Sequence, residues 1–289
     1  MDFTVTQHGA VMRVKFPSLV FSEADQTDQS RRISVVLNGG TDASFVSTDA
    51  DGVVWITGKT TKNSGGVPSN FAHYFTVGIF AGSAGGAPTA KPVSTHADAE
   101  WAYADFSADD PLHDLLTVRI ATSLISAEQS MLNFQREVGA EKSFDSVTGA
   151  ARDEWRKVLS KVKVEEISSE YSSKEQEDMK TVLYSALYRT SIFPRQLTET
   201  DSNGNLIHWS PYSPMGEVFP GVLSTDSGFW DSYSSLYPLH SIINSDVLGK
   251  QMLQGIYFSL LIPSILPLTH FFLCLWRACC LPLLFCSVL

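Results

Sequence analysis

The stretch of the chain best equipped for chemistry runs from Ser227 to Leu239 and reads SGFWDSYSSLYPL. Within it, the indole of Trp230 offers a flat apolar face to a pyranose ring. The carboxylate of Asp231 can accept hydrogen bonds from vicinal sugar hydroxyls. These two residue types predict a sugar-binding position. The stretch also fits an ordinary helix start, with candidate N-caps Asp226, Ser227 and Asp231 and with one buried face formed by Tyr233, Leu236 and Tyr237.

The overall composition is that of an acidic globular protein. The 289 residues suffice for two domains, 44% are hydrophobic and 18% charged, and the net charge is −10. Such a charge disfavours unassisted binding to nucleic acid or anionic lipid. All four cysteines follow Gly255, so the body of the chain says nothing about redox compartment. The first five residues lack the charged and apolar regions of a signal peptide, and the sequence leaves the compartment open.

Up to residue 125 the apolar pattern is that of β-strands. β-Branched and aromatic runs are divided by turn-forming residues without a helical period between them, which predicts an antiparallel β-sandwich. Met12, Val14 and Phe16 are expected on the buried face of their strand. His73 and His113 are expected to be ordinary histidines, because neither has a second ligand type at metal spacing. The runs expected to form strands are 11–16, 32–37, 52–58, 73–80 and 116–122.

From Ser126 the apolar period becomes helical. Ser126 and Gln129 read as a capping box, and Gly139 reads as the C′ residue that ends this helix. A second helix is expected at about 150–161. A third starts with a capping box at 173–176, carries an inward stripe and is closed by Pro194. A fourth runs from the Trp230–Asp231 stretch to about Gln254. A tight turn is expected at 201–205 and an irregular loop at 209–220, and the inward stripe of the third helix is Met179, Leu183, Ala186, Leu187 and Tyr188.

Three stretches, in this order, resemble glycoside hydrolase family 92, the calcium-dependent α-mannosidases. VRIATSLISAEQ at 118–129, running on to Asn133 and Glu137, is similar to the family's last sandwich strand and linker helix. LYSALYR at 183–189 looks like the "YTALYH" helix that opens its catalytic toroid. GFWDSYSSLYPL at 228–239 looks like the family's "FWDTYRTLYPLL".

This resemblance implies a chain that is β first and α afterwards. A partial antiparallel β-sandwich is expected in residues 1–125 and linker helices in 126–172. The first helices of an (α/α)6 toroid are expected in 173–254, followed by a hydrophobic tail in 255–289. The glycine-rich segment that opens the family's sandwich has no counterpart, so the sandwich is expected to be incomplete.

The resemblance also implies an activity, the hydrolysis of α-mannosidic bonds in N-glycans or mannans with inversion. One carboxylic acid protonates the leaving oxygen while a second carboxylate activates water from the opposite face of the sugar. A calcium ion on the sugar hydroxyls assists. By resemblance, Trp230 packs on the non-reducing-end mannose and Asp231 accepts from its hydroxyls, and neither is the acid or the base.

This sequence departs from the family in the residues that carry out catalysis. The family's carboxylates and most of its calcium ligands belong to later helices, whereas Asp246 is the last carboxylate side chain here. No catalytic residue or metal ligand can be assigned, and the expectation is a mannosidase fragment without turnover of its own. The alternative is a non-catalytic carbohydrate-binding β-sandwich protein, with or without a membrane tether.

Three interpretations of residues 256–289 stay open. The first is a membrane segment, because about 20 apolar residues span a bilayer, although Arg277 is costly near its centre. The second is a core helix, against which the lack of polar periodicity speaks. The third is translation of a retained intron or a shifted frame, because Leu, Ser, Pro and Phe dominate and their codons are pyrimidine-rich.

Overall fold

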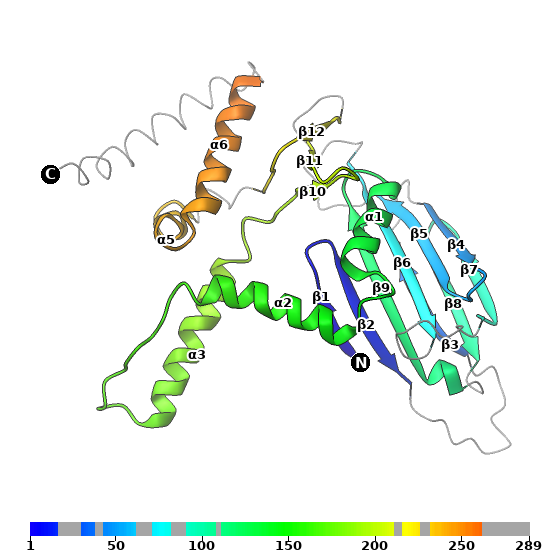
Figure 1. Ribbon diagram of the computed structural model, residues 1–289, viewed down its shortest axis with the longest axis horizontal. Coiled ribbons are helices and arrows are strands. Elements are labelled where there is room, and N and C mark those ends of the chain that lie inside the picture. The colour runs from blue at the N-terminus through cyan, green and yellow to red at the C-terminus, as the bar shows by residue number, and fades with distance from the viewer. Residues whose placement is uncertain are drawn as a thin grey trace. The chain divides into compact units, whose positions relative to one another are not determined.

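The computed structural model (Figure 1) describes residues 1–16, 30–37, 43–61, 71–81, 91–107, 111–210, 216–225 and 232–261. The chain divides into two compact units. Unit 1 comprises Met1–Lys163 and Leu197–Gly221. Unit 2 comprises Val164–Gln196 and the chain from Val222 onward. Unit 1 therefore holds the strands and linker helices, and unit 2 the later helices.

Unit 1 is built on a six-stranded sheet in which every neighbouring pair is antiparallel. The strands in spatial order are β1 (Asp2–Val5), β2 (Gly9–Lys15), β9 (Leu115–Ser123), β6 (His73–Ala81), β5 (Val54–Thr60) and β4 (Ala43–Thr48). The central β9 pairs with β2 on one side and β6 on the other, so it joins the first and the later strands of the chain.

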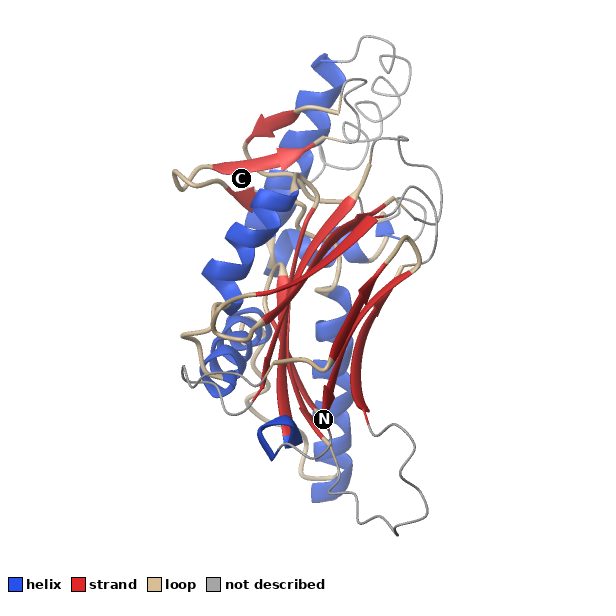
Figure 2. Ribbon diagram, turned by 90° about the vertical axis from the view of Figure 1, so that its right-hand side faces the viewer, coloured by secondary structure: helices blue, strands red, loops and turns tan. Residues whose placement is uncertain are grey.

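A second antiparallel sheet consists of β3 (Ser30–Val36), β8 (Trp101–Ser107) and β7 (Ser94–Ala97), in that order. One cluster of buried side chains draws on both sheets, including Ile56 and Ile79 from the first and Phe106 from the second. The sheets therefore pack face to face, as the two strand layers in Figure 2 indicate. This arrangement confirms the predicted antiparallel β-domain, and Met12, Val14 and Phe16 contact its core as expected.

The five runs predicted as strands form β2, β3, β5, β6 and β9. β1, β4, β7 and β8 were not predicted. β7 is exposed at every position and β1 at three of its four, so neither shows the apolar alternation that marks a half-buried strand. In β8 the inward positions include Ala102 and Ala104, both fully buried but too small to give a strong apolar signal.

α1 (Ala127–Val138) lies on the other face of the six-stranded sheet, and α2 (Phe144–Leu159) contacts the sheet at its β1–β2 edge. Phe134 and Val138 of α1 and Val147 of α2 form a second buried cluster with Val11 and Ala121 of the sheet. Unit 1 thus has three layers: the small sheet, the large sheet and the helices.

The helix starts follow their caps. Ser126 is the N-cap of α1 and accepts a hydrogen bond from the Gln129 amide, which is one half of the predicted capping box. The other half is not formed, because the Ser126 amide donates to Ser123 Oγ and the Gln129 side chain donates to other partners. α2 starts at Phe144 instead of about 150, because Ser143 caps it by accepting from the Ser146 amide. The third helix, α3 (Ser173–Thr190), has its capping box one residue earlier than expected, between Ser172 and Glu175.

Residues 199–220 return to unit 1 as three short antiparallel strands: β10 (Glu199–Thr200), β11 (Leu206–Trp209) and β12 (Val218–Pro220). The predicted tight turn at 201–205 joins the first two, and Gly204 takes a positive φ of 88° there. The prediction of an irregular loop at 209–220 was wrong at both ends, because Trp209 belongs to β11 and Val218–Pro220 form β12, which pairs with it.

In unit 2, the described residues form α3, α5 (Leu236–Ile243) and α6 (Ser245–Leu261). The expected single helix up to Gln254 is interrupted at Asn244, whose φ of −137° and ψ of 42° are not helical. Of the predicted inward stripe of α3 only Leu187 is buried, and the prediction was wrong at the other four positions, which are exposed. The complete toroid stays a prediction.

The hydrophobic tail falls mostly outside the described residues. Its start, up to Leu261, continues α6, and residues 262–289 are not described. No helix within the described part of the chain has the length and apolar character needed to cross a membrane.

Candidate functional site

Both predicted sugar-binding residues, Trp230 and Asp231, lie outside the described residues, as do the N-cap candidates Asp226 and Ser227. The sequence motif 226–231 is bounded on each side by described chain, and both boundaries belong to unit 2. The structure therefore defines how the two ends of the motif are held.

The end before the motif is fixed by Thr225. Its amide donates to the carbonyl of Arg195 over 2.8 Å, and its hydroxyl accepts from the Arg195 amide over 2.9 Å. An isolated β-bridge joins the neighbouring pair Gln196 and Ser224. The carbonyl of Thr225 also accepts from the side-chain amide of Gln251 in α6 over 3.1 Å. Four interactions thus hold the backbone immediately before the motif.

The end after the motif runs into α5. Ser232 is 3% exposed, and His240 is 2% exposed with its Nε2 3.0 Å from the carbonyl of Thr190 at the end of α3. The predicted buried face is wrong at Tyr233, which is 53% exposed, while Leu236 and Tyr237 are half-buried. A buried histidine, not the aromatic stripe, anchors this side.

A network of polar side chains, most of them buried, lies between α1 and β10 in unit 1. Glu199 is 2% exposed and both of its oxygens are occupied. Oε1 accepts from the Leu124 amide over 2.8 Å, and Oε2 accepts from the Asn133 side-chain amide over 2.7 Å. Gln129 and Arg136 of α1 both donate to the carbonyl of Thr200. These bonds attach β10 to α1.

His8 belongs to the same arrangement. Its Nδ1 lies 2.5 Å from Glu137 Oε1, its amide donates to Glu137 Oε2 over 2.8 Å, and its Nε2 lies 2.9 Å from the carbonyl of Thr198. Burial alone would lower the pKa of His8, but the hydrogen bond and charge of Glu137, the Thr198 carbonyl and the charge of Glu199 raise it. Burial would raise the pKa of Glu137, and its bonds from His8 outweigh this and lower it.

Both carboxylates accept hydrogen bonds from groups of the protein itself and so position the chain. An inverting glycosidase needs two carboxyl groups that face the substrate and leave room for a water. The oxygens of Glu137 and Glu199 are instead engaged by donors of the protein itself. No sequence pattern indicated His8 or Glu199, whereas Asn133 and Glu137 were named only through the family resemblance.

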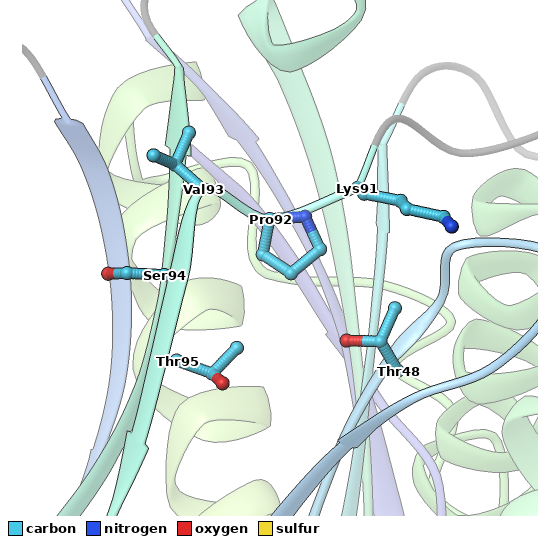
Figure 3. A pocket seen from close by; sticks show the side chains of 6 residues that line it. All are labelled: Thr48, Lys91, Pro92, Val93, Ser94 and Thr95. Atoms are coloured by element: carbon cyan, nitrogen blue, oxygen red, sulfur yellow. The ribbon is translucent and has the colours of Figure 1, made fainter.

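A hollow of about 330 Å³ lies between the end of β4 and the start of β7 (Figure 3). It carries neither a carboxylate nor an aromatic ring, so it offers no groups for glycoside hydrolysis. Its lining residues are Thr48, Lys91, Pro92, Val93, Ser94 and Thr95.

Within the described ranges, no three His, Cys, Asp or Glu side chains are grouped so that they could hold a metal ion. His113, expected to be ordinary, is buried with Nδ1 2.9 Å from the Ser107 carbonyl.

Residues 129–259 match the family model described as the glycosyl hydrolase family 92 catalytic domain. Two of the three stretches that carry the resemblance, 183–189 and 228–239, lie inside this match. No curated protein matches the chain.

Solved structures of the same family also match. A family GH92 inverting mannosidase from Bacteroides thetaiotaomicron is 30% identical, with a TM-score of 0.68 over 86% of this chain and 31% of its own. The GH92 glycosyl hydrolase ccman5 is 18% identical, with a TM-score of 0.68 over 89% of this chain and 32% of its own. A GH92 α-mannosidase from Bacteroides thetaiotaomicron is 17% identical, with a TM-score of 0.53 over 82% of this chain and 30% of its own.

The chain thus spans about a third of the length of the family structures that it matches. The antiparallel sheets followed by helices correspond to the β-domain and the first part of the helical domain in those structures. The matched residues and the structural likeness together make the chain similar to one part of the glycoside hydrolase family 92 enzymes.

Proposed function

We propose that the chain forms part of an inverting α-mannosidase and contributes one wall of its sugar subsite through Trp230 and Asp231. The observation that carries this proposal is the match over residues 129–259, which includes both residues. The 30% identity to an inverting mannosidase over 86% of the chain supports the reaction class. The substrates are α-mannosides such as the termini of N-glycans or mannans.

In this proposal the two side chains bind and orient the sugar. The indole of Trp230 packs on the apolar face of the terminal mannose ring, and Asp231 accepts hydrogen bonds from its vicinal hydroxyls. The anchored flanks at Thr225 and His240 would keep the motif in place during binding. In the family, a calcium ion bound to the sugar hydroxyls assists distortion of the sugar ring. The roles proposed here for Trp230 and Asp231 do not depend on that ion.

Binding of methyl α-D-mannopyranoside to the purified 289-residue chain, measured by saturation-transfer NMR, tests the subsite. We expect Trp230→Ala to abolish the signal and Asp231→Asn to weaken binding about tenfold, since a charged acceptor is replaced by a neutral amide. Trp101→Ala is the matched control, because it removes an exposed indole from β8 in unit 1. Equal binding by Trp230→Ala and the parent chain would exclude the subsite.

We further propose that this chain alone does not turn over α-mannosides, because no acid–base pair can be assigned to it. The test is the release of mannose from an aryl α-mannoside with calcium and with a chelator, at high protein concentration. We expect no release in either condition. Release that depends on calcium and survives repurification of the chain would show that the catalytic carboxylates are present.

A further inference from the structure

His8 sits where a distant part of the chain returns to unit 1. The chain leaves this unit after Lys163 and re-enters it at Leu197, so residues 197–200 are named here the return segment. His8 occupies the turn between β1 and β2, where its carbonyl accepts from the Thr122 amide over 2.8 Å. The side chain, 15% exposed, joins this turn to Glu137 of α1 and to Thr198 of the return segment.

Both ring nitrogens of His8 face oxygen acceptors. Nδ1 lies against a carboxylate oxygen of Glu137 at 2.5 Å, and Nε2 lies against the Thr198 carbonyl at 2.9 Å. A carbonyl and a carboxylate can only accept hydrogen bonds, so both bonds require a proton on each nitrogen, which is the imidazolium form. A neutral imidazole carries one proton and would set a lone pair against the remaining oxygen.

The charged groups around His8 favour the imidazolium. Glu137 from α1 and Glu199 from β10 are both acidic and both act on the ring. From β9 the contact is Thr122, which does not titrate, while Arg119 of that strand is engaged with carbonyls at the end of α1. Arg136 of α1 is directed to the carbonyls of Thr200 and Asp201.

We propose that His8 is a proton-operated clamp on the return segment, closed when the ring is an imidazolium and loosened at Thr198 when the ring is neutral. The neutral ring keeps its bond to the Glu137 carboxylate, which is the stronger acceptor, and releases the Thr198 carbonyl. Loosening is confined to that end, because Glu199 and Thr200 are held by Asn133, Gln129 and Arg136, whose bonds do not change near neutral pH. This device is independent of the proposed sugar subsite.

The direction of the pH effect follows from the raised pKa of His8. The clamp is closed below the ordinary histidine value of 6.5 and opens as the pH rises through the higher pKa of the folded chain. Glu137, with a pKa lowered from 4.5, remains a carboxylate throughout this range.

The sequence permits a direct measurement at one peptide bond. The dipeptide Thr-Glu occurs only at Thr198–Glu199. Labelling threonine carbonyls with ¹³C and glutamate amides with ¹⁵N therefore gives one carbonyl–amide NMR signal for the full chain. We expect the Thr198 ¹³C shift to titrate over the pH range in which the His8 ring titrates and with the same midpoint, which lies above the ordinary histidine pKa of 6.5.

Two variants and a control separate the clamp from other causes. His8→Gln should make the Thr198 shift independent of pH in this range, and Glu137→Gln should lower the midpoints of His8 and Thr198 together. His96→Gln, which breaks another His–carboxylate pair on β7, should leave the titration unchanged. A flat Thr198 shift in the parent chain, or an unchanged titration in His8→Gln, overturns the proposal. If His8→Gln does not fold, the test rests on Glu137→Gln. A Thr198 titration midpoint that is not lowered in that variant would also overturn the proposal.

Discussion

Arg119 in β9 donates through Nη1 to the carbonyl of Val138, the last residue of α1, over 2.9 Å. The same guanidinium bonds the carbonyls of Gly139 at 2.9 Å and Lys142 at 2.7 Å, and the residue is 1% exposed. Helix C-termini leave carbonyls without partners and carry partial negative charge. A buried cation from the sheet therefore caps the helix that covers it.

Replacing Arg119 by methionine should lower the free energy of unfolding by about 3 kcal/mol, because three carbonyls lose a charged donor inside the protein. Burial lowers the pKa of Arg119 and the charge of Glu141 opposes this. Urea unfolding followed by circular dichroism measures the loss. Arg156→Met, which breaks an exposed pair with Asp153, should leave the midpoint unchanged. Equal midpoints for the two variants would contradict the capping role.

The end of α1 shows what the sequence predicts and what it does not. The sequence predicts that Gly139 ends the helix, and α1 does end there, with Gly139 as its C-cap. Its φ is −50°, however, so the glycine is not used for a positive φ. The unpaired carbonyls are satisfied by Arg119, which no local pattern could have indicated because its side chain comes from another element.

The same reasoning explains the candidate site. Long alternating strands and capped helices depend on neighbours in sequence, so β2, β9 and α1 could be predicted. The side chain of His8 contacts Glu137 and Thr198, and that of Glu199 contacts Leu124 and Asn133, so the partners lie far apart in the sequence. Such partners are set by the tertiary fold. The sugar-binding pair Trp230 and Asp231 came from a motif and stays a prediction.

Glu199→Gln should destabilise unit 1 by about 2 kcal/mol although the two side chains have the same shape. Both carboxylate oxygens accept from N–H groups, of Leu124 and Asn133, so the new amide nitrogen must face a donor in either orientation. Thermal unfolding measures the change. Glu166→Gln, in the exposed connector before α3, is the control. A Glu199→Gln chain as stable as this control would show that the carboxylate is dispensable.

Asp98, which precedes β8, should have a pKa lowered to about 2. The hydrogen bond from His96 lowers its pKa most, followed by those from the amides of Trp101 and Glu100. Any stabilisation of the fold by this carboxylate is fully present above the ordinary Asp pKa of 3.8. It is lost as the pH falls through the lowered pKa of the folded chain. Carboxyl ¹³C NMR gives the value directly. His96→Ala should raise it, and titration near 3.8 in the parent chain would contradict these bonds.

Two glycines should respond to alanine in opposite directions. A Cβ on Gly9 in β2 would lie 2.5 Å from the carbonyl oxygen of Ile120, so the paired strands must separate. We expect Gly9→Ala to cost about 1–3 kcal/mol by overpacking. A Cβ on Gly149 in α2 meets nothing within 4 Å, so Gly149→Ala should stabilise by about 0.5–1 kcal/mol through helix propensity. Urea unfolding of both variants measures the contrast. If Gly9→Ala proves neutral, β2 and β9 are not held as closely as this register requires, and the turn that carries His8 would be less constrained than the clamp demands.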